Sequence, residues 1–121
     1  SLAQQNKAEL YLLYSIPEGF QPNIMIDSHQ GYTSVQAFLD NMYYPDREVT
    51  EELISPNGDT GVRVSIGEFS GEKFHYVERI IYNPNSGAIY VAIAERPDSQ
   101  VGNAALWEST RKVLNSFRLP N

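Results

Sequence analysis

Two side chains that can bind a metal ion stand close together early in the chain. Asp27 and His29 lie two residues apart, at the end of a segment, 23–28, whose composition predicts a strand. Side chains two apart in a strand point the same way, so this pair could share a metal ion. Two ligands do not make a metal site, however, and no third ligand follows at a fixed spacing. The alternative is an ordinary strand end in water.

A charged pair, Glu78 and Arg79, interrupts the most apolar stretch of the chain. Neighbours in a strand point to opposite faces, and burying either charge alone is costly. We therefore expect the pair to lie beyond the cover of helices, to pair with charges on other strands, or to line a cleft that a partner completes. Arg79 is the better binding candidate, because a guanidinium can hold a carboxylate through two parallel hydrogen bonds.

Aromatic side chains gather where a predicted helix ends, at Tyr43 and Tyr44. Aromatic residues with a polar tip are enriched where proteins meet proteins, so both are candidate binding residues. The alternative is that they only cover the edge of the core. His75 is the one other histidine, and its place at the start of a predicted strand favours a partly exposed structural residue.

The sequence contains no recognisable catalytic motif. It lacks a Gly-x-Ser-x-Gly elbow and a glycine-rich phosphate loop, and the adjacent Glu51 and Glu52 would point apart in a strand. It has no cysteine, which excludes disulfides, thiolate metal sites and cysteine nucleophiles. We expect a noncatalytic protein without a cofactor. A small metal-dependent hydrolase that uses Asp27, His29 or His75 is the alternative from another class.

Composition narrows the class of partner. The 121 residues, 41% of them hydrophobic, suit one domain, which we place at 9–121 after a flexible lead-in at 1–8. A formal net charge of -6 disfavours nucleic acid and anionic membrane surfaces. No apolar run approaches the roughly 18 residues that would insert into a bilayer. A cationic protein partner, a metal ion or a neutral ligand remains compatible with this charge.

The first residues, Ser1-Leu2-Ala3-Gln4-Gln5, are similar to the end of a signal-peptide cleavage site, with small residues before two glutamines. This pattern predicts a periplasmic or secreted protein. A residue left by a tag, or an arbitrary boundary, would give the same start, so a cytoplasmic location stays open.

A β-hairpin is the clearest structural signal. Two runs rich in β-branched and aromatic residues, 74–83 and 88–95, flank Pro84-Asn85-Ser86-Gly87, four residues that favour a turn. That loop places Asn83 opposite Ala88 and gives both faces of the hairpin apolar side chains. Because an exposed sheet face would be polar, we expect both faces to be covered.

The remaining elements follow from periodicity and turn residues. Strands are expected at 10–16, 23–28 and 61–69, with an ambiguous one at 48–55 and turns at 56–59 and 70–73. One helix is expected from Thr33, capped by Thr33 and Gln36, to about Tyr44. The last helix carries a stripe from Leu106 and Trp107 to Phe117, with Asp98 or Asn103 as its cap. The expected fold class is α+β: a three-layer α/β/α sandwich with a mainly antiparallel sheet and a helix on each face.

Two segments carry a family resemblance. Tyr14-Ser15-Ile16-Pro17-Glu18-Gly19-Phe20 resembles the aromatic-x-x-Pro-x-Gly-aromatic opening of the Mog1/PsbP/DcrB-like fold. Leu114-Asn115-Ser116-Phe117 is similar to the aliphatic-x-Ser-Phe close of that group. These positions are architectural, and no family active site carries over to this chain.

The resemblance implies a role in binding. The group includes the extrinsic photosystem II protein PsbP, the Ran-binding Mog1, DcrB-like bacterial lipoproteins and chaperones of type VI secretion effectors, most of which bind or assemble other proteins. It implies a noncatalytic binding or accessory domain of an exported bacterial protein that acts through protein–protein contact. The alternative is a chaperone or immunity-type partner of a secreted effector, as a possible homodimer.

Overall fold

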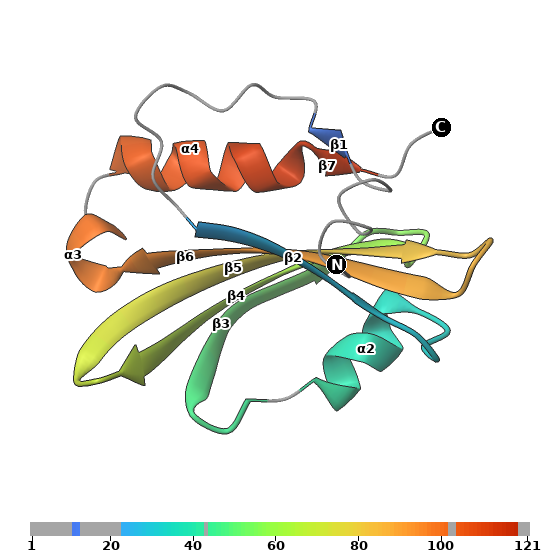
Figure 1. The fold of residues 1–121 in the computed structure, drawn as a ribbon, viewed down its shortest axis with the longest axis horizontal. Helices are drawn as coiled ribbons and strands as arrows, with labels where there is room; N and C mark the ends of the chain where they lie inside the picture. The colour runs from blue at the N-terminus through green and yellow to red at the C-terminus, as the bar shows by residue number, and fades with distance from the viewer. Residues whose placement is uncertain (1–10, 13–22, 43, 102–103, 119–121) are drawn as a thin grey trace.

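The computed structural model describes residues 11–12, 23–42, 44–101 and 104–118. Its centre is a sheet of five antiparallel strands in the order β2-β6-β5-β4-β3 (Figure 1). The strands are β2 (Asn23–His29), β3 (Arg47–Ile54), β4 (Thr60–Phe69), β5 (Glu72–Asn83) and β6 (Ala88–Pro97). The helices are α2 (Val35–Asn41), α3 (Asp98–Val101) and α4 (Ala104–Asn115), and a short pair joins β1 (Tyr11–Leu12) to β7 (Phe117–Arg118). The chain is thus an α+β protein with a mainly antiparallel sheet.

The predicted hairpin lies at the middle of this sheet. Asn83 pairs with Ala88, as predicted, and the Asn83 carbonyl accepts a hydrogen bond of 2.8 Å from the Gly87 amide. Gly87 has a φ of 73°, a left-handed conformation that favours glycine. β5 is the third of the five strands, so the hairpin is central to the fold.

Two clusters of buried residues form the core, and side chains of β5 and β6 alternate between them. The first cluster joins α4 and β7 to the sheet and contains Ile26, Val64, Val77, Ile81, Ala88, Tyr90, Ala92, Ala94, Val113, Leu114 and Phe117. The second joins α2 to the sheet and contains Val35, Phe38, Leu39, Ile80, Ile89 and Val91. The prediction that both faces of the hairpin are covered is confirmed.

Helix α2 is shorter than the predicted helix and begins at a different cap. Ser34, in extended conformation, accepts a hydrogen bond of 3.1 Å from the Ala37 amide through its hydroxyl, so the predicted capping box of Thr33 and Gln36 is wrong. The Gln36 side chain instead donates to Asp40 at 2.8 Å. The helix ends at Asn41, before the predicted end near Tyr44.

A glycine in β4 lets α2 approach the sheet closely. A Cβ atom added at Gly61 would lie 2.7 Å from Cγ1 of Val35, the first residue of α2. A branched side chain such as valine cannot easily give way, so the position favours glycine. Val35 itself is completely buried.

The edge strand β3 contains an irregularity. The pairing of β3 with β4 shifts between Val49 and Glu51, which leaves Thr50 as the extra residue of a β-bulge. The Thr50 hydroxyl donates to the Val64 carbonyl at 3.3 Å. The strand that the sequence left ambiguous therefore exists, and the bulge changes which of its side chains share a face.

The turn between β4 and β5 is tighter than predicted. It consists of Ser70 and Gly71 alone, with φ values of 52° and 77°, and Glu72 already pairs with Phe69. Left-handed φ at both central residues is typical of the two-residue turns that match the twist of a hairpin. The predicted four-residue turn at 70–73 is therefore wrong by two residues.

The last helix also ends earlier than its apolar stripe. α4 stops at Asn115, and Phe117 belongs to β7. The side chains of Leu106 and Trp107, the cap candidate Asn103, the lead-in at 1–8 and most of the predicted strand at 10–16 lie outside the described residues. Among the described helices, none is long and apolar enough to cross a membrane.

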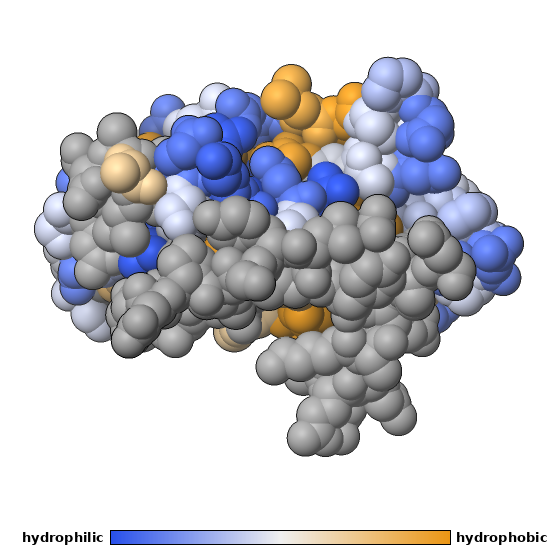
Figure 2. All heavy atoms as spheres, turned by 90° about the horizontal axis from the view of Figure 1, so that it is seen from above, coloured by the Kyte–Doolittle hydropathy of each residue, from blue (hydrophilic) through white to orange (hydrophobic). Residues whose placement is uncertain are grey.

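The surface of the described residues is mostly polar on the side seen from above, where hydrophilic residues surround a smaller hydrophobic area (Figure 2). The exposed large hydrophobic side chains are Met25, Tyr44, Val49 and Leu53. Val49 lies in β3, and Tyr44 lies three residues before the start of that strand.

Candidate functional site

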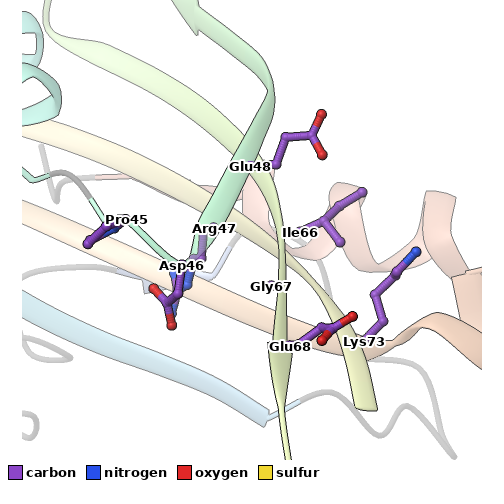
Figure 3. A pocket seen from close by; sticks show the side chains of 8 residues that line it. All are labelled: Pro45, Asp46, Arg47, Glu48, Ile66, Gly67, Glu68 and Lys73. Atoms are coloured by element: carbon purple, nitrogen blue, oxygen red, sulfur yellow. The ribbon is translucent and has the colours of Figure 1, made fainter. Parts of the chain in front are cut away.

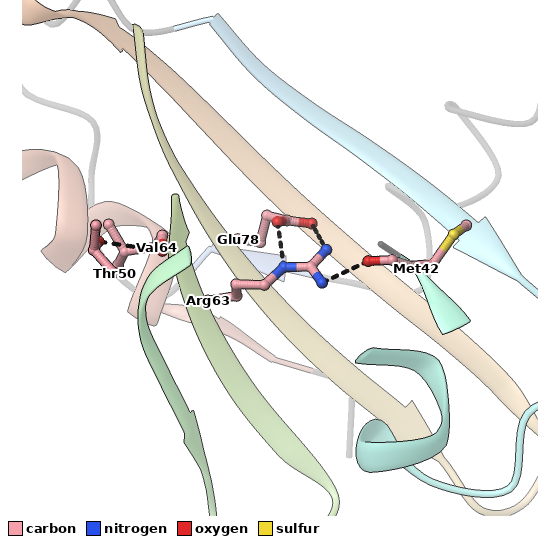
Figure 4. Close-up of polar contacts among 5 residues, drawn as sticks. All are labelled: Met42, Thr50, Arg63, Val64 and Glu78. Carbon is pink, nitrogen blue, oxygen red and sulfur yellow. Dashed lines mark hydrogen bonds and ion pairs between the residues drawn. The ribbon is translucent and has the colours of Figure 1, made fainter. Parts of the chain in front are cut away.

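A buried ion pair joins β4 and β5 at the predicted polar interruption. Arg63 and Glu78 are direct cross-strand partners, and only 3% and 1% of their surfaces are exposed. Arg63 donates from Nε and Nη2 to the two carboxylate oxygens of Glu78 at 2.9 and 3.1 Å (Figure 4). Glu78 therefore pairs with a charge on another strand, which is one of the three predicted alternatives.

The same guanidinium also fixes the segment after α2. Nη1 of Arg63 donates to the Met42 carbonyl at 2.7 Å (Figure 4). Each donor group of Arg63 thus has an acceptor, as a buried cation requires. The ion pair therefore holds Met42, the residue after α2, over the sheet.

Arg79 points to the opposite face, as predicted. Its Nε donates to the Phe117 carbonyl at 3.1 Å, which ties β5 to β7. Burial lowers the pKa of Arg79 below its ordinary value. The structure thus gives Arg79 a local role beside the end of the chain, and its predicted grip on a carboxylate stays a prediction.

Tyr44 lies beside the buried ion pair and is 37% exposed. Cζ of Arg63 is 5.7 Å from the centre of its ring, and Cζ of Arg47 is 4.3 Å from it. Two predicted binding residues, Glu78 and Tyr44, are therefore brought together through Arg63. Of the other two, Arg79 lies on the opposite face, and Tyr43 lies outside the described residues.

Arg47 is the residue that sequence analysis missed. At the start of β3, its Cζ lies 3.8 Å from the ring centre of Tyr76 as well as 4.3 Å from that of Tyr44. Both distances are within the range of a cation–π contact. Tyr44 is only three residues before Arg47, and the Tyr44 carbonyl accepts a hydrogen bond from the Arg47 amide at 3.0 Å. The contact with Tyr76 depends on the pairing of three strands, so no local sequence signal marks it.

Glycine makes room for this contact. Arg47 pairs with Gly67 of β4, and a Cβ atom added there would lie 3.1 Å from Cγ of Arg47 and 3.5 Å from the Tyr76 ring. The bare backbone lets the arginine stem lie across the strand and reach the ring beyond it. The position thus favours glycine for packing, not for backbone conformation.

The arginine–tyrosine surface consists of Tyr44, Val49, Arg47 and Tyr76. Val49 is 45% exposed, and it shares a face with Tyr76 because both pair with Ser65 from opposite sides. The register places this face on the same side of β5 as Glu78, Ile80 and the cluster under α2. The surface therefore continues the face that α2 covers in part.

A shallow cavity of about 540 Å³ lies at the rim of this surface. It is bounded by the 45–48 segment, residues 66–68 of β4 and Lys73. Glu48, Ile66, Glu68 and Lys73 extend to one side of β4, while Pro45, Asp46 and Arg47 lie on the other (Figure 3). Its acidic and basic side chains are mixed, so the cavity favours no single charge of ligand.

The predicted metal ligands do lie together. Asp27 Oδ2 and His29 Nε2 are 3.6 Å apart, and the His29 ring packs 5.0 Å from that of Phe38. Within the part of the chain that the structure describes, no group of three or more possible ligands surrounds them. Among the described residues, this contact at a strand end therefore offers a metal ion two protein ligands, Asp27 and His29.

The second histidine has a carboxylate partner. His75 Nε2 lies 2.7 Å from Oδ1 of Asp98, the first residue of α3. This hydrogen bond is the main cause that lowers the pKa of Asp98 below its ordinary value of 3.8. The pair ties β5 to α3 and lies apart from the arginine–tyrosine surface.

Comparison with protein-family models and with curated proteins finds no match for this sequence.

Proposed function

We propose that this protein is a noncatalytic binding or accessory domain, and that it contacts a protein partner through the arginine–tyrosine surface. The observation that carries the proposal is the exposed Tyr44 ring, held against Arg47 beside the exposed Val49. Arginine and tyrosine are the residue types enriched at the energetic centres of protein interfaces. An aromatic ring already fixed by a neighbour also loses less entropy on binding.

The buried residues beneath the arginine–tyrosine surface also favour it as the binding surface. The buried pair of Arg63 and Glu78 holds the Met42 carbonyl and lies next to the Tyr44 ring. A contact residue on such a base binds without first being ordered, which is how preorganisation strengthens an interface.

We also propose that the protein has a three-layer α/β/α sandwich fold of the Mog1/PsbP/DcrB-like kind. Its support is the pair of core clusters, one that includes residues of α4 and one that includes residues of α2. The motifs at 14–20 and 114–117 add to that support. A binding role is the common property of this group.

Affinity isolation with matched variants tests the proposed function. Wild type, the double variant Tyr44→Ala/Val49→Ser and the control Leu53→Ser would each be used to recover partners from the organism that produces the protein. Leu53 is 61% exposed on the same strand but, after the bulge, pairs with Val62 on the other face. We expect a partner to be recovered with wild type and Leu53→Ser and to fall at least about tenfold with the double variant, as the loss of one interface anchor implies.

Two results would contradict the proposal. One is equal recovery with wild type and the Tyr44→Ala/Val49→Ser variant, provided that circular dichroism shows both to be folded. The other is a substrate turned over by the purified protein when no partner is recovered.

A further inference from the structure

Arg47 has donors that no group in the described part of the chain uses. Its guanidinium contacts the rings of Tyr44 and Tyr76, and it takes part in no hydrogen bond or ion pair with another described residue. A cation–π contact engages the face of a guanidinium and leaves its five N–H donors at the edge. Arg47 is partly buried, so these donors cannot all be freely hydrated.

Arg63, the second arginine beside the Tyr44 ring, has a purely structural role. Arg63 also faces Tyr44, at 5.7 Å, but it donates to both oxygens of Glu78 and to the Met42 carbonyl. Arg47 contacts the same tyrosine, but no described residue provides its guanidinium with such an acceptor. Its rigid, unused fork matches the geometry of a carboxylate, which accepts two parallel hydrogen bonds.

The neighbours of Arg47 define the rest of the ligand. Tyr44 and Val49 expose apolar surface beside it, so a suitable ligand carries an apolar group next to its carboxylate. The chain has a net charge of -6, which repels a strongly acidic ligand at long range. A single carboxylate flanked by an apolar residue avoids most of that repulsion.

We propose that Arg47 recognises the side-chain carboxylate of one Asp or Glu in the partner protein, next to an apolar residue that packs on Tyr44 and Val49. This inference rests on the proposed function and names the partner chemistry of the same surface. The carboxylate accepts two hydrogen bonds from the edge of Arg47, while the two tyrosine rings keep the guanidinium in place.

Short peptides with blocked ends test this recognition by nuclear magnetic resonance. The probe peptide is acetyl-Ser-Glu-Leu-Ser-amide, and its matched control replaces Glu by Gln. A third peptide, acetyl-Ser-Gln-Leu-Ser with a free carboxyl end, separates a terminal from a side-chain carboxylate. The signal followed is the Nε–Hε resonance of Arg47, which is assigned by its loss in Arg47→Lys.

The Glu peptide should shift the Arg47 resonance in a saturable way at millimolar concentration, and the two Gln peptides should not. In Arg47→Lys, binding followed at the backbone amides of Gly67 and Glu68 should weaken by about tenfold, because lysine keeps the charge but loses the fork. The control Arg111→Lys changes an arginine of α4 that pairs with Glu51 on the other face of the sheet, and it should leave binding unchanged.

Three outcomes would overturn the inference: equal shifts with the Glu peptide and its blocked Gln control, equal affinity of wild type and Arg47→Lys, or binding of the free-ended peptide alone. Absence of any Arg47 shift at tens of millimolar peptide would do the same.

The isolated partner separates this inference from the proposed function. If the partner depends on Tyr44 and Val49 but binds Arg47→Lys normally, the proposed function stands and only the recognition of a carboxylate by Arg47 is wrong. A partner that ignores Tyr44 and Val49 would remove the proposed function itself.

Discussion

Glu78 and Arg79 were the residues that sequence analysis could locate but not explain. Alternation along a strand was enough to send them to opposite faces, and the structure confirms this. The partner of Glu78 was not predictable, because it depends on the register of β4 against β5. A four-residue turn at 70–73 would have placed Glu78 opposite Ser65, whereas the observed two-residue turn places it opposite Arg63.

Breaking the buried pair should be costly. Glu78→Ala would leave Arg63 buried without its carboxylate, and we expect the free energy of unfolding to fall by about 3–5 kcal/mol. The double variant Arg63→Met/Glu78→Leu should recover most of that loss, because apolar side chains of similar size need no compensation. Chemical denaturation of the three proteins measures both effects.

Glu51→Ala provides the comparison, since Glu51 pairs with Arg111 where both side chains are about one third exposed. Such surface pairs contribute about 0–1 kcal/mol. If Glu78→Ala cost no more than Glu51→Ala, the account of the buried pair would be wrong.

At the scale of elements, the strands were easier to predict than the ends of the helices. The central hairpin and its loop follow from a turn sequence between two β-rich runs, and both were correct. Helix α2 was expected at 33–44 but spans only Val35–Asn41, about 10 Å of axis. Apolar periodicity continues through Met42, so the pattern alone could not show where the backbone leaves the helix.

The identity of the α2 cap can be tested directly. Ser34→Ala removes the hydroxyl that accepts from the Ala37 amide, so the free energy of unfolding should fall by about 1 kcal/mol. Thr33→Ala, at the position that sequence analysis favoured, should have almost no effect because Thr33 is exposed and lies outside the cap. Thermal denaturation of both variants makes the comparison. A larger loss for Thr33→Ala than for Ser34→Ala would restore the predicted capping box.

For the whole molecule, the short α2 determines which residues lie outside the helix and on the open face of the sheet. A helix that continued to Tyr44 would bring Tyr44 into its last turn, whereas the observed helix ends at Asn41 and leaves Tyr44 outside it. The face of the sheet around Arg47 consequently stays open, with 37% of Tyr44 and 45% of Val49 exposed. The α+β class was predictable from composition and periodicity, but this open face was not, since it depends on three strands and one helix end together.

The outer edge of the sheet is protected against nonspecific pairing. β3 is an edge strand, and it carries a bulge and the charges of Glu48, Glu51 and Glu52. Bulges and charges are the usual means by which edge strands avoid adding further strands. A side-chain contact on the face of the sheet therefore fits this molecule better than the addition of a strand at its edge.

Site-specific photo-cross-linking in the producing organism tests the central claim most directly. A benzophenone amino acid at Tyr44, an aromatic position, should give a discrete adduct with a partner protein, and Arg47→Gln should reduce its yield. The same group at Asn85, an exposed residue in the distant β5–β6 loop, should give no adduct. The mass of the adduct distinguishes another protein from a second copy of this chain. Equal adducts at both positions, or an adduct at Asn85 alone, would contradict the assignment of this surface as the binding site.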